Sequence, residues 1–445
     1  MSALVRRCTF PIAAALAAAM ALSCGGSPTH AAGPGGTLKP TEATLPRPPG
    51  APNRSNAQTF LSTQLLADFD QLWAFVRDHY CFFGDKRVAW ERVRDDYRPR
   101  AEQMTDRDAL LRLVEDLLDE LYDPHSHVND HLPDSRRFPG YDVWAEWRDG
   151  PAIITDVRRP SAAYDAGARA GMEVVTIDGV PVVPATQARR PQHLAAPDRE
   201  ADGWALLSLL SGRLGTPRRL QLRDRGGVSL DVRIDDRTPP PADEALTFRI
   251  LDGGIGYIAI HSFGSDDLVE RFDRALGALR ETRGLLIDVR NNGGGDTALA
   301  RPIMGRFIEK RMQYAWMNRR DHEAMGPRWP EFVEPRGPFT YQKPVVVLVN
   351  HWSASMAEGF PMGMSAIHRA TIVGTRMMGL GAGVIDSALG WSQINIQLSA
   401  EPVFHVDGTP RWHLRPDILV DLTQPTKDDD PILAAGIRKV TELRK

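Results

Sequence analysis

Residues 344–360 read PVVVLVNHWSASMAEGF, and this stretch is the most informative about the fold. Its run of aliphatic residues predicts a strand buried on both faces, as in a parallel sheet, and a helix is expected to start after the turn. A serine in such a turn lies above the sheet, and the N–H of the next residue lies at a helix N-terminus, where it can stabilise an oxyanion. This topology is that of a nucleophile elbow. Ser353 and Ser355 are both candidates, although a serine at a helix start is also a common N-cap.

A second loop carries chemistry at residues 285–295, LLIDVRNNGGG. A buried strand runs into two asparagines and three glycines, whose backbone N–H groups can approach a ligand because no side chains intervene. The loop lacks G-x-G-x-x-G and G-K-[ST], so it is neither a dinucleotide fingerprint nor a P-loop. We expect Asp288 and Arg290 to form an internal ion pair that holds the loop.

Both loops belong to a segment in which strands and helices alternate, residues 243–445, after a proline-rich boundary at 239–242. Alternation of this kind predicts an α/β domain with a largely buried sheet. The expected strands are residues 255–260, 281–289, 343–349, 370–374 and 394–398. The expected helices are residues 267–280, 297–308 and 356–367.

Two further segments precede the α/β domain. Residues 58–136 show apolar residues at helical spacing, with Thr105 or Asp106 as a cap, and predict a helical domain whose last helix is stopped by Pro124 in LYDPHSHVNDH. Residues 137–240 contain short β-type runs separated by Gly, Pro and Asp turns, and predict a β-rich domain. Residues 161–182 of that segment resemble the PDZ pattern of a short helix, a glycine, a strand and an I-x-G turn. The alternative is a PDZ-like module that serves only as a spacer.

The N-terminus is typical of an export signal. Arg6 and Arg7 precede an apolar stretch too short to span a bilayer, so residues 1–24 predict a signal peptide. Two outcomes stay open at its end: simple cleavage, or lipidation of Cys24, which would attach the protein to a membrane through a lipid anchor. Residues 25–57 predict a flexible tether. Only Cys81 then remains in the body, so no internal disulfide is expected.

The composition narrows the choice of partners. The chain has 445 residues and a formal net charge of −3, with 54 Lys and Arg against 57 Asp and Glu. There is no basic surplus to neutralise phosphates, so we expect no nucleic-acid partner.

Taken together, the helical segment with LYDPHSH, the PDZ-like module, the DVRNNGG loop and VNHWSASMAE resemble the tail-specific or C-terminal-processing serine peptidase family over residues 59–422. The resemblance implies a crotonase/ClpP-like α/β catalytic domain and Ser355 as nucleophile, with Glu358 at the family's acidic position. It implies oxyanion N–H groups from Gly294 and Met356, a polypeptide substrate and no cofactor. An exported protein of this family is expected in the bacterial cell envelope, periplasmic or anchored.

The general base departs from the family pattern. In the processing branch a Lys serves, but Leu380 stands at its place here, and neighbouring Arg376 stays protonated and cannot act as a base. The tricorn-like branch uses a His from the segment before the PDZ-like module, and His125 matches it, with a pKa suited to the task. That branch also uses a downstream carboxylate, which GTPRWHLRPD lacks. Glu358 or Asp407 could substitute.

Two other hypotheses remain. His125, His127 and His131 have the look of a metal cluster, although the spacing misses that of zinc-dependent hydrolases by one residue; the family resemblance implies no metal. Leu380 and the missing carboxylate also favour a catalytically inactive homologue that acts as a peptide-binding or scaffold protein.

Overall fold

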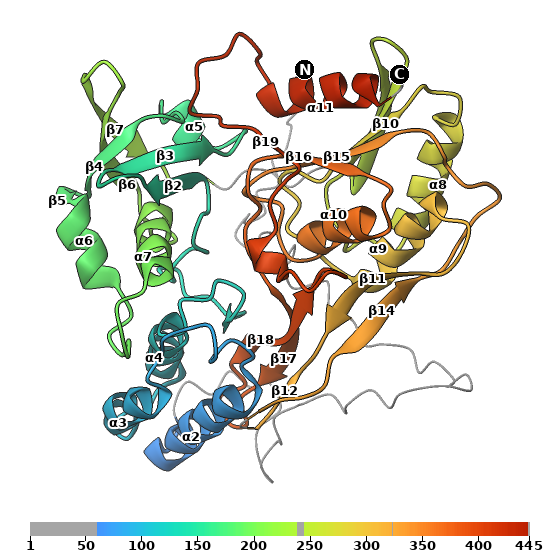
Figure 1. Ribbon diagram of the computed structural model, residues 1–445. Coiled ribbons are helices and arrows are strands. Elements are labelled where there is room, and N and C mark those ends of the chain that lie inside the picture. Colours follow the sequence, from blue (N-terminus) through green and yellow to red (C-terminus); the bar gives the residue numbers. More distant parts are fainter. Residues whose placement is uncertain (1–59, 238–243, 323, 444–445) are drawn as a thin grey trace, which may run out of the picture.

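The computed structural model describes residues 60–237, 244–322 and 324–443 (Figure 1). The predicted signal peptide (1–24), Cys24, the predicted tether (25–57) and the boundary residues 239–242 lie outside these ranges. Within them, no helix combines the length and apolarity that a membrane crossing requires. Cys81 is buried and is a free thiol.

A six-stranded sheet forms the centre of the C-terminal part, in the order β19-β16-β15-β10-β9-β8. All neighbours run parallel except β8 and β9. The strands are β8 (Leu246–Leu251), β9 (Ile255–Ile260), β10 (Leu285–Asp288), β15 (Val345–Val349), β16 (Thr371–Gly374) and β19 (Ile418–Leu419). Every residue of β9, β10 and β15 is buried, as their aliphatic runs predict.

Helices cover both faces of this sheet. The helices α8 (Leu268–Ala278), α9 (Thr297–Met304) and α10 (Met356–Ala366) pack on one face, together with the 3-10 turn η1 (Gly305–Phe307). Helix α11 (Pro431–Glu442) packs on the other face, against Leu286, Val346 and Leu348. The alternation of side chains along each strand supplies both apolar faces. Three of these helices lie where the sequence predicted them, whereas α11 was not predicted.

A second, five-stranded sheet pairs strands of the C-terminal part with a short strand near residue 127. Strand β18 (Asn395–Phe404) pairs with β17 (Ala382–Ala388), with β11 (Met312–Met317) and with the short β1 (His127–Val128), and β14 (Trp329–Val333) extends the sheet beyond β11. Strand β1 pairs antiparallel, with His127 opposite Gln397. The strand expected at residues 394–398 is therefore present as the start of β18, and it pairs with β17 and β1 rather than with the main sheet. A two-stranded ribbon, β12 (Arg320–Asp321) and β13 (Ala324–Met325), lies beside it.

The helices α2 (Ser62–His79), α3 (Trp90–Ala101) and α4 (Arg107–Asp119) form the N-terminal part. Asp106 caps α4 by accepting a hydrogen bond from the Ala109 N–H. The apolar faces of these helices share one buried cluster with residues of β17 and β18, among them Ile396 and Leu398. Because of this shared core, the loop after α4, which carries His125, lies against the C-terminal part of the chain.

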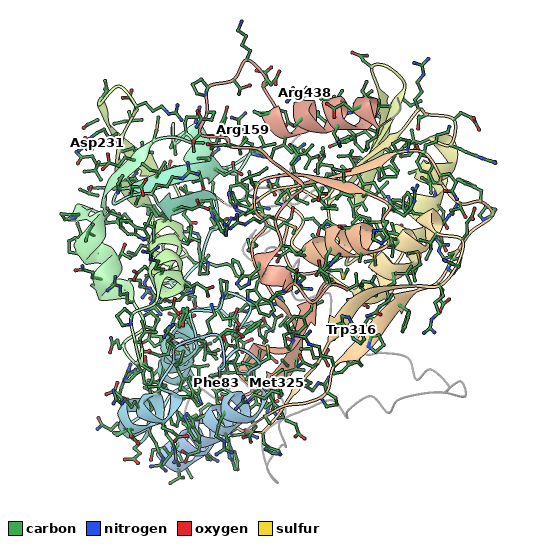
Figure 2. The ribbon with its side chains drawn as sticks, viewed as in Figure 1. Phe83, Arg159, Asp231, Trp316, Met325 and Arg438 are labelled. Carbon is green, nitrogen blue, oxygen red and sulfur yellow. The ribbon has the colours of Figure 1, made fainter. Side chains whose placement is uncertain are left out.

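The segment between them forms a six-stranded antiparallel sheet with three helices. Its elements are β2 (Val143–Trp147), β3 (Ala152–Val157), α5 (Ala162–Asp165), β4 (Glu173–Ile177), β5 (Val180–Pro181), α6 (Val182–Arg189), α7 (Arg199–Ser211), β6 (Arg218–Arg223) and β7 (Ser229–Ile234). The predicted strands are present, but α7 was not predicted. Arg159, labelled in Figure 2, donates to the Asp429 backbone carbonyl and so links this segment to the loop before α11.

Candidate active site

The turn between β15 and α10 places Ser355 at the N-terminus of α10. Ser355 has φ of 52° and ψ of −114°, a conformation that residues with a Cβ rarely adopt. Its backbone N–H donates to Glu358 Oε1 at 3.0 Å, which holds the turn from inside the helix. The neighbouring Met356 N–H has no acceptor among the described residues, so this helix N-terminus presents a free donor beside the serine.

The two candidate serines have different environments. Ser353 is fully buried, and its Oγ donates to the Val289 carbonyl and accepts from the Asn350 N–H. These two hydrogen bonds use the hydroxyl of Ser353 and join the turn to the carboxyl end of β10. Ser355 is partly exposed, which leaves it as the serine that a substrate can reach.

The glycine loop after β10 lies directly against this turn. A Cβ on Gly294 would lie 2.8 Å from Ser355 Cβ and 2.9 Å from Met356 N, so only glycine leaves room above the free donor. The Gly294 N–H itself donates to Asn292 Oδ1 at 2.8 Å. Gly294 therefore contributes space in this structure, while its expected role as an oxyanion donor would require release of Asn292.

Glu358 is nearly fully buried below the turn. Besides the Ser355 N–H, its carboxylate accepts the N–H groups of Gly379 and Leu380, each at 2.8 Å. Burial raises the pKa of Glu358 to about 7, although the three N–H donors and the Arg411 charge act in the opposite direction. The carboxylate ties the turn to residues 379–380, the segment in which the family Lys would stand. Leu380 is buried there, so no base projects from this segment.

His125 lies in the loop between α4 and β1, where the pairing of β1 with β18 fixes the chain. Its N–H donates to Asp123 Oδ1, and Gln397 Nε2 donates to its carbonyl. The ring is buried and faces the Ala382 backbone, and burial followed by the charge of Arg411 lowers the pKa of His125 well below its ordinary value. Its Nδ1 has no hydrogen-bond partner in the described part of the chain, so Nδ1 does not bind Ser355 in this structure.

Arg411 is the residue of this site that the sequence did not reveal. It lies in the 3-10 turn η2 (Arg411–His413), in the GTPRWHLRPD stretch where a carboxylate was expected. Its guanidinium is buried and donates to the carbonyls of Leu380 and Ala382. The only signal in the sequence was the absent carboxylate, because nothing local indicates that this arginine turns inward.

The remaining candidates are placed elsewhere. Asp407 is exposed rather than buried beside His125. It pairs with His405, with 2.9 Å between His405 Nδ1 and the Asp407 carboxylate. Asp407 is therefore not a substitute for the missing carboxylate in this structure. As predicted, Arg290 binds Asp288, at 2.6 Å, and it also binds Asp430 at 2.7 Å.

The histidine cluster does not assemble into a metal site. His127 contacts the Val128 carbonyl and Gln397 Nε2 rather than a second histidine, and His131 is exposed. In the residues that the structure describes, no three His, Cys, Asp or Glu side chains are grouped so as to hold a metal ion.

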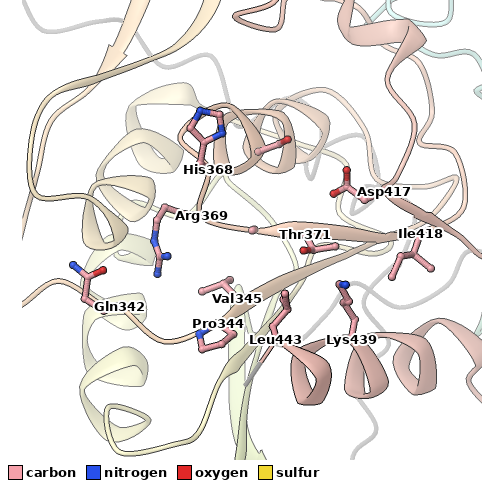
Figure 3. A pocket seen from close by; sticks show the side chains of 12 residues that line it. Gln342, Pro344, Val345, His368, Arg369, Thr371, Asp417, Ile418, Lys439 and Leu443 are labelled. Atoms are coloured by element: carbon pink, nitrogen blue, oxygen red, sulfur yellow. The ribbon is translucent and has the colours of Figure 1, made fainter. Parts of the chain in front are cut away.

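A pocket of about 630 Å³ lies at the amino ends of strands β15 and β16 of the main sheet (Figure 3). Its lining includes Val345 and Thr371, the first residues of β15 and β16, whereas Ser355 follows the carboxyl end of β15. Ligands of open α/β sheets bind at the carboxyl ends of the strands. The pocket is therefore separate from the candidate active site.

Comparison with known families matches two parts of the chain. Residues 254–420 match the model of peptidase family S41, and residues 64–119 match the tricorn protease C1 domain. The first match contains Gly294, Ser355, Glu358 and Arg411, while His125 lies a few residues after the second.

Three proteins of similar sequence are peptidases. The carboxy-terminal processing protease CtpA of Bacillus subtilis is 26% identical over 312 residues, which cover 67% of this chain and 60% of that protein. The tricorn protease of Thermoplasma volcanium is 23% identical over 337 residues, which cover 70% of this chain and 29% of that protein. The tail-specific protease of Haemophilus influenzae is 29% identical over 197 residues, 40% of this chain and 26% of that protein. The chain thus spans less than two thirds of each of these relatives.

Solved structures share the fold. Mature CPAF complexed with lactacystin superposes with a TM-score of 0.59 at 16% identity, over 86% of this chain and 98% of that chain. The photosystem II D1 C-terminal processing protease superposes with a TM-score of 0.51 at 19% identity, over 84% and 97%. The mixed α/β architecture is therefore common to both.

Proposed function

Since this chain is a member of peptidase family S41, related to the carboxy-terminal processing, tail-specific and tricorn proteases, we propose that it is a serine endopeptidase that cleaves polypeptides. Ser355 is the nucleophile and His125 the general base. The observation that carries the proposal is the strained turn at Ser355, beside the free Met356 N–H and the space left by Gly294.

In the proposed reaction, Ser355 Oγ attacks the scissile carbonyl while His125 takes its proton. The charge that develops on the carbonyl oxygen is stabilised by the Met356 N–H at the start of α10, and by the Gly294 N–H once Asn292 releases it. His125 then gives the proton to the leaving amine, and water hydrolyses the acyl-enzyme by the same route. Burial keeps the ring neutral, as a base must be, at the cost of a low proton affinity. The step requires the ring and Ser355 to come together when substrate binds.

The finer organisation belongs to the same proposal. Residues 243–445 would form a crotonase/ClpP-like catalytic domain, residues 137–240 a PDZ-like domain that presents polypeptide by strand addition, and residues 58–136 a helical domain that carries the base. Residues 1–24 would direct export to the bacterial cell envelope, with Cys24 lipidated or lost on cleavage and residues 25–57 as the tether.

The test compares hydrolysis of an unfolded protein, and labelling by a serine-directed fluorophosphonate, in wild type and Ser355→Ala. Ser365→Ala, in the same helix α10, is the matched control. We expect Ser355→Ala to abolish both signals and Ser365→Ala to preserve them. Equal hydrolysis by wild type and Ser355→Ala would refute the assignment.

A second candidate function is supported by the environment of His125. The charge of Arg411, rather than that of a carboxylate, acts on the buried ring, and Leu380 occupies the place of the family Lys. An inactive homologue would bind unfolded polypeptide without hydrolysing it, acting as a peptide-binding or scaffold protein. Absence of fluorophosphonate labelling at Ser355, together with retained peptide binding by calorimetry, would favour this function over the first.

A further inference from the structure

Arg411 is a buried cation without an acidic partner in direct contact. Arg411 is 5% exposed. Its side chain forms no ion pair with a carboxylate of the described residues, although the charge of Glu358 raises its pKa against the effect of burial. Its donors go to backbone carbonyls: Nε and Nη2 bind Leu380 O, and Nη2 binds Ala382 O at 2.9 Å. Burial of an arginine is costly unless its donors are used, so this geometry indicates a specific role for the side chain.

The backbone N–H of Leu380 connects Arg411 to the proposed nucleophile through Glu358. The Leu380 N–H donates to Glu358 Oε1, the same oxygen that accepts the Ser355 N–H. A Cβ on Gly359 would lie 3.5 Å from Arg411 Nη1, so the guanidinium also packs against the first turn of α10. Leu380 is therefore held at its N–H by Glu358 and at its carbonyl by Arg411.

The second carbonyl that Arg411 binds, that of Ala382, connects Arg411 to the proposed base, His125. The His125 ring faces the Ala382 backbone, although its Nδ1 forms no hydrogen bond in the described part of the chain, and after burial the charge of Arg411 does most to lower the pKa of the ring. A histidine base needs a partner that fixes its ring, and either a carboxylate or a backbone carbonyl can supply one. Arg411 suits the task of fixing such a carbonyl, because its planar fork binds two acceptors at once and stays protonated.

We propose that Arg411 is a positioning residue for catalysis: it fixes the Leu380 and Ala382 carbonyls, and thereby sets the His125 ring relative to Ser355 in place of the missing carboxylate. The inference rests on the proposed function. Arg411 touches no reacting atom. It acts through the backbone of residues 380–382, and its effect is on kcat rather than on substrate affinity.

The experiment measures kcat, KM and fluorophosphonate labelling for Arg411→Ala, Arg411→Gln and Arg411→Lys, each with and without millimolar guanidinium. We expect Arg411→Ala to lower kcat about a hundredfold, as misplacement of a catalytic group by about 1 Å does, with KM nearly unchanged. Added guanidinium is expected to restore part of this loss, because it can occupy the vacated site. Arg411→Lys should recover less than wild-type activity, because an ammonium lacks the planar fork.

Arg306→Ala is the matched control, since Arg306 is an equally buried cation whose side chain binds Asp273 and the Phe339 carbonyl. Its effect should not respond to guanidinium. Wild-type kcat in a folded Arg411 variant, or a loss that guanidinium does not restore in any folded variant, would overturn the proposal. Arg411→Gln serves if Arg411→Ala does not fold. A wild-type protein that neither hydrolyses nor labels would instead refute the proposed function itself.

Discussion

Replacement of Glu358 by Gln tests the electrostatics of the buried carboxylate below the Ser355 turn most directly. The Glu358 carboxylate is buried and accepts three backbone N–H groups, from Ser355, Gly379 and Leu380. Burial disfavours the charged form strongly enough to raise the pKa of Glu358 to about 7, from an ordinary value of 4.5. Glutamine keeps the shape and one acceptor oxygen but cannot ionise.

The sign of the effect follows from linkage. The folded-state pKa of Glu358 lies above its unfolded value, so the stability that this group contributes is fully present below pH about 4.5 and is lost as pH rises through about 7. A shift of this size corresponds to about 3 kcal/mol between the two extremes. We therefore expect the free energy of unfolding of Glu358→Gln, relative to wild type, to increase by about 2.5 kcal/mol from pH 5 to pH 8, since wild type has already lost part of the stabilisation at pH 5.

The assay is urea unfolding followed by the fluorescence of the ten tryptophans, at pH 5, 6, 7 and 8, with equal m-values required for each comparison. Ser365→Ala, which introduces no titrating group, should differ from wild type by a constant amount across this range. If the difference between Glu358→Gln and wild type is also constant, the carboxylate is ionised throughout. The three N–H donors and Arg411 would then outweigh burial, and the reasoning would be refuted.

Three further predictions concern Ser355 and two residues near its turn, Gly294 and Leu380. Ser355→Gly should be about 1 kcal/mol more stable than Ser355→Ala by urea midpoint, because glycine relieves the positive φ; a less stable glycine variant would contradict the strain. Gly294→Ala should slow fluorophosphonate labelling at least tenfold, since its Cβ would lie 2.9 Å from Met356 N and block that donor. Loss of an oxyanion donor is worth about a hundredfold or more. Unchanged labelling would show that the Met356 N–H is not used. Leu380→Lys should destabilise the fold by about 3–5 kcal/mol, because it adds an unpaired buried charge near Arg411, without raising hydrolysis; a gain in kcat would show that a base can act from this position.

The local patterns of the sequence predicted much of the architecture. The aliphatic runs of β9, β10 and β15 are buried as expected, and α8, α9 and α10 lie near their predicted places. These predictions succeed because strand and helix periodicity are written in neighbouring residues. The strand expected at residues 394–398 is also present, within β18, but its pairing with β17 and β1 could not be predicted, because an apolar run indicates a strand and not its partner.

Local patterns of residue types were enough to locate the Ser355 turn, the glycine loop and the histidine segment along the chain. The contacts among these three segments are visible only in the folded molecule. It buries Ser353 in a bond to Val289, it occupies the Gly294 N–H with Asn292, and it directs Arg411 to carbonyls 29 and 31 residues away in the chain. The physical reason is that these outcomes depend on which groups meet when the sheets and helices pack, and a buried donor takes whatever acceptor that packing brings within reach.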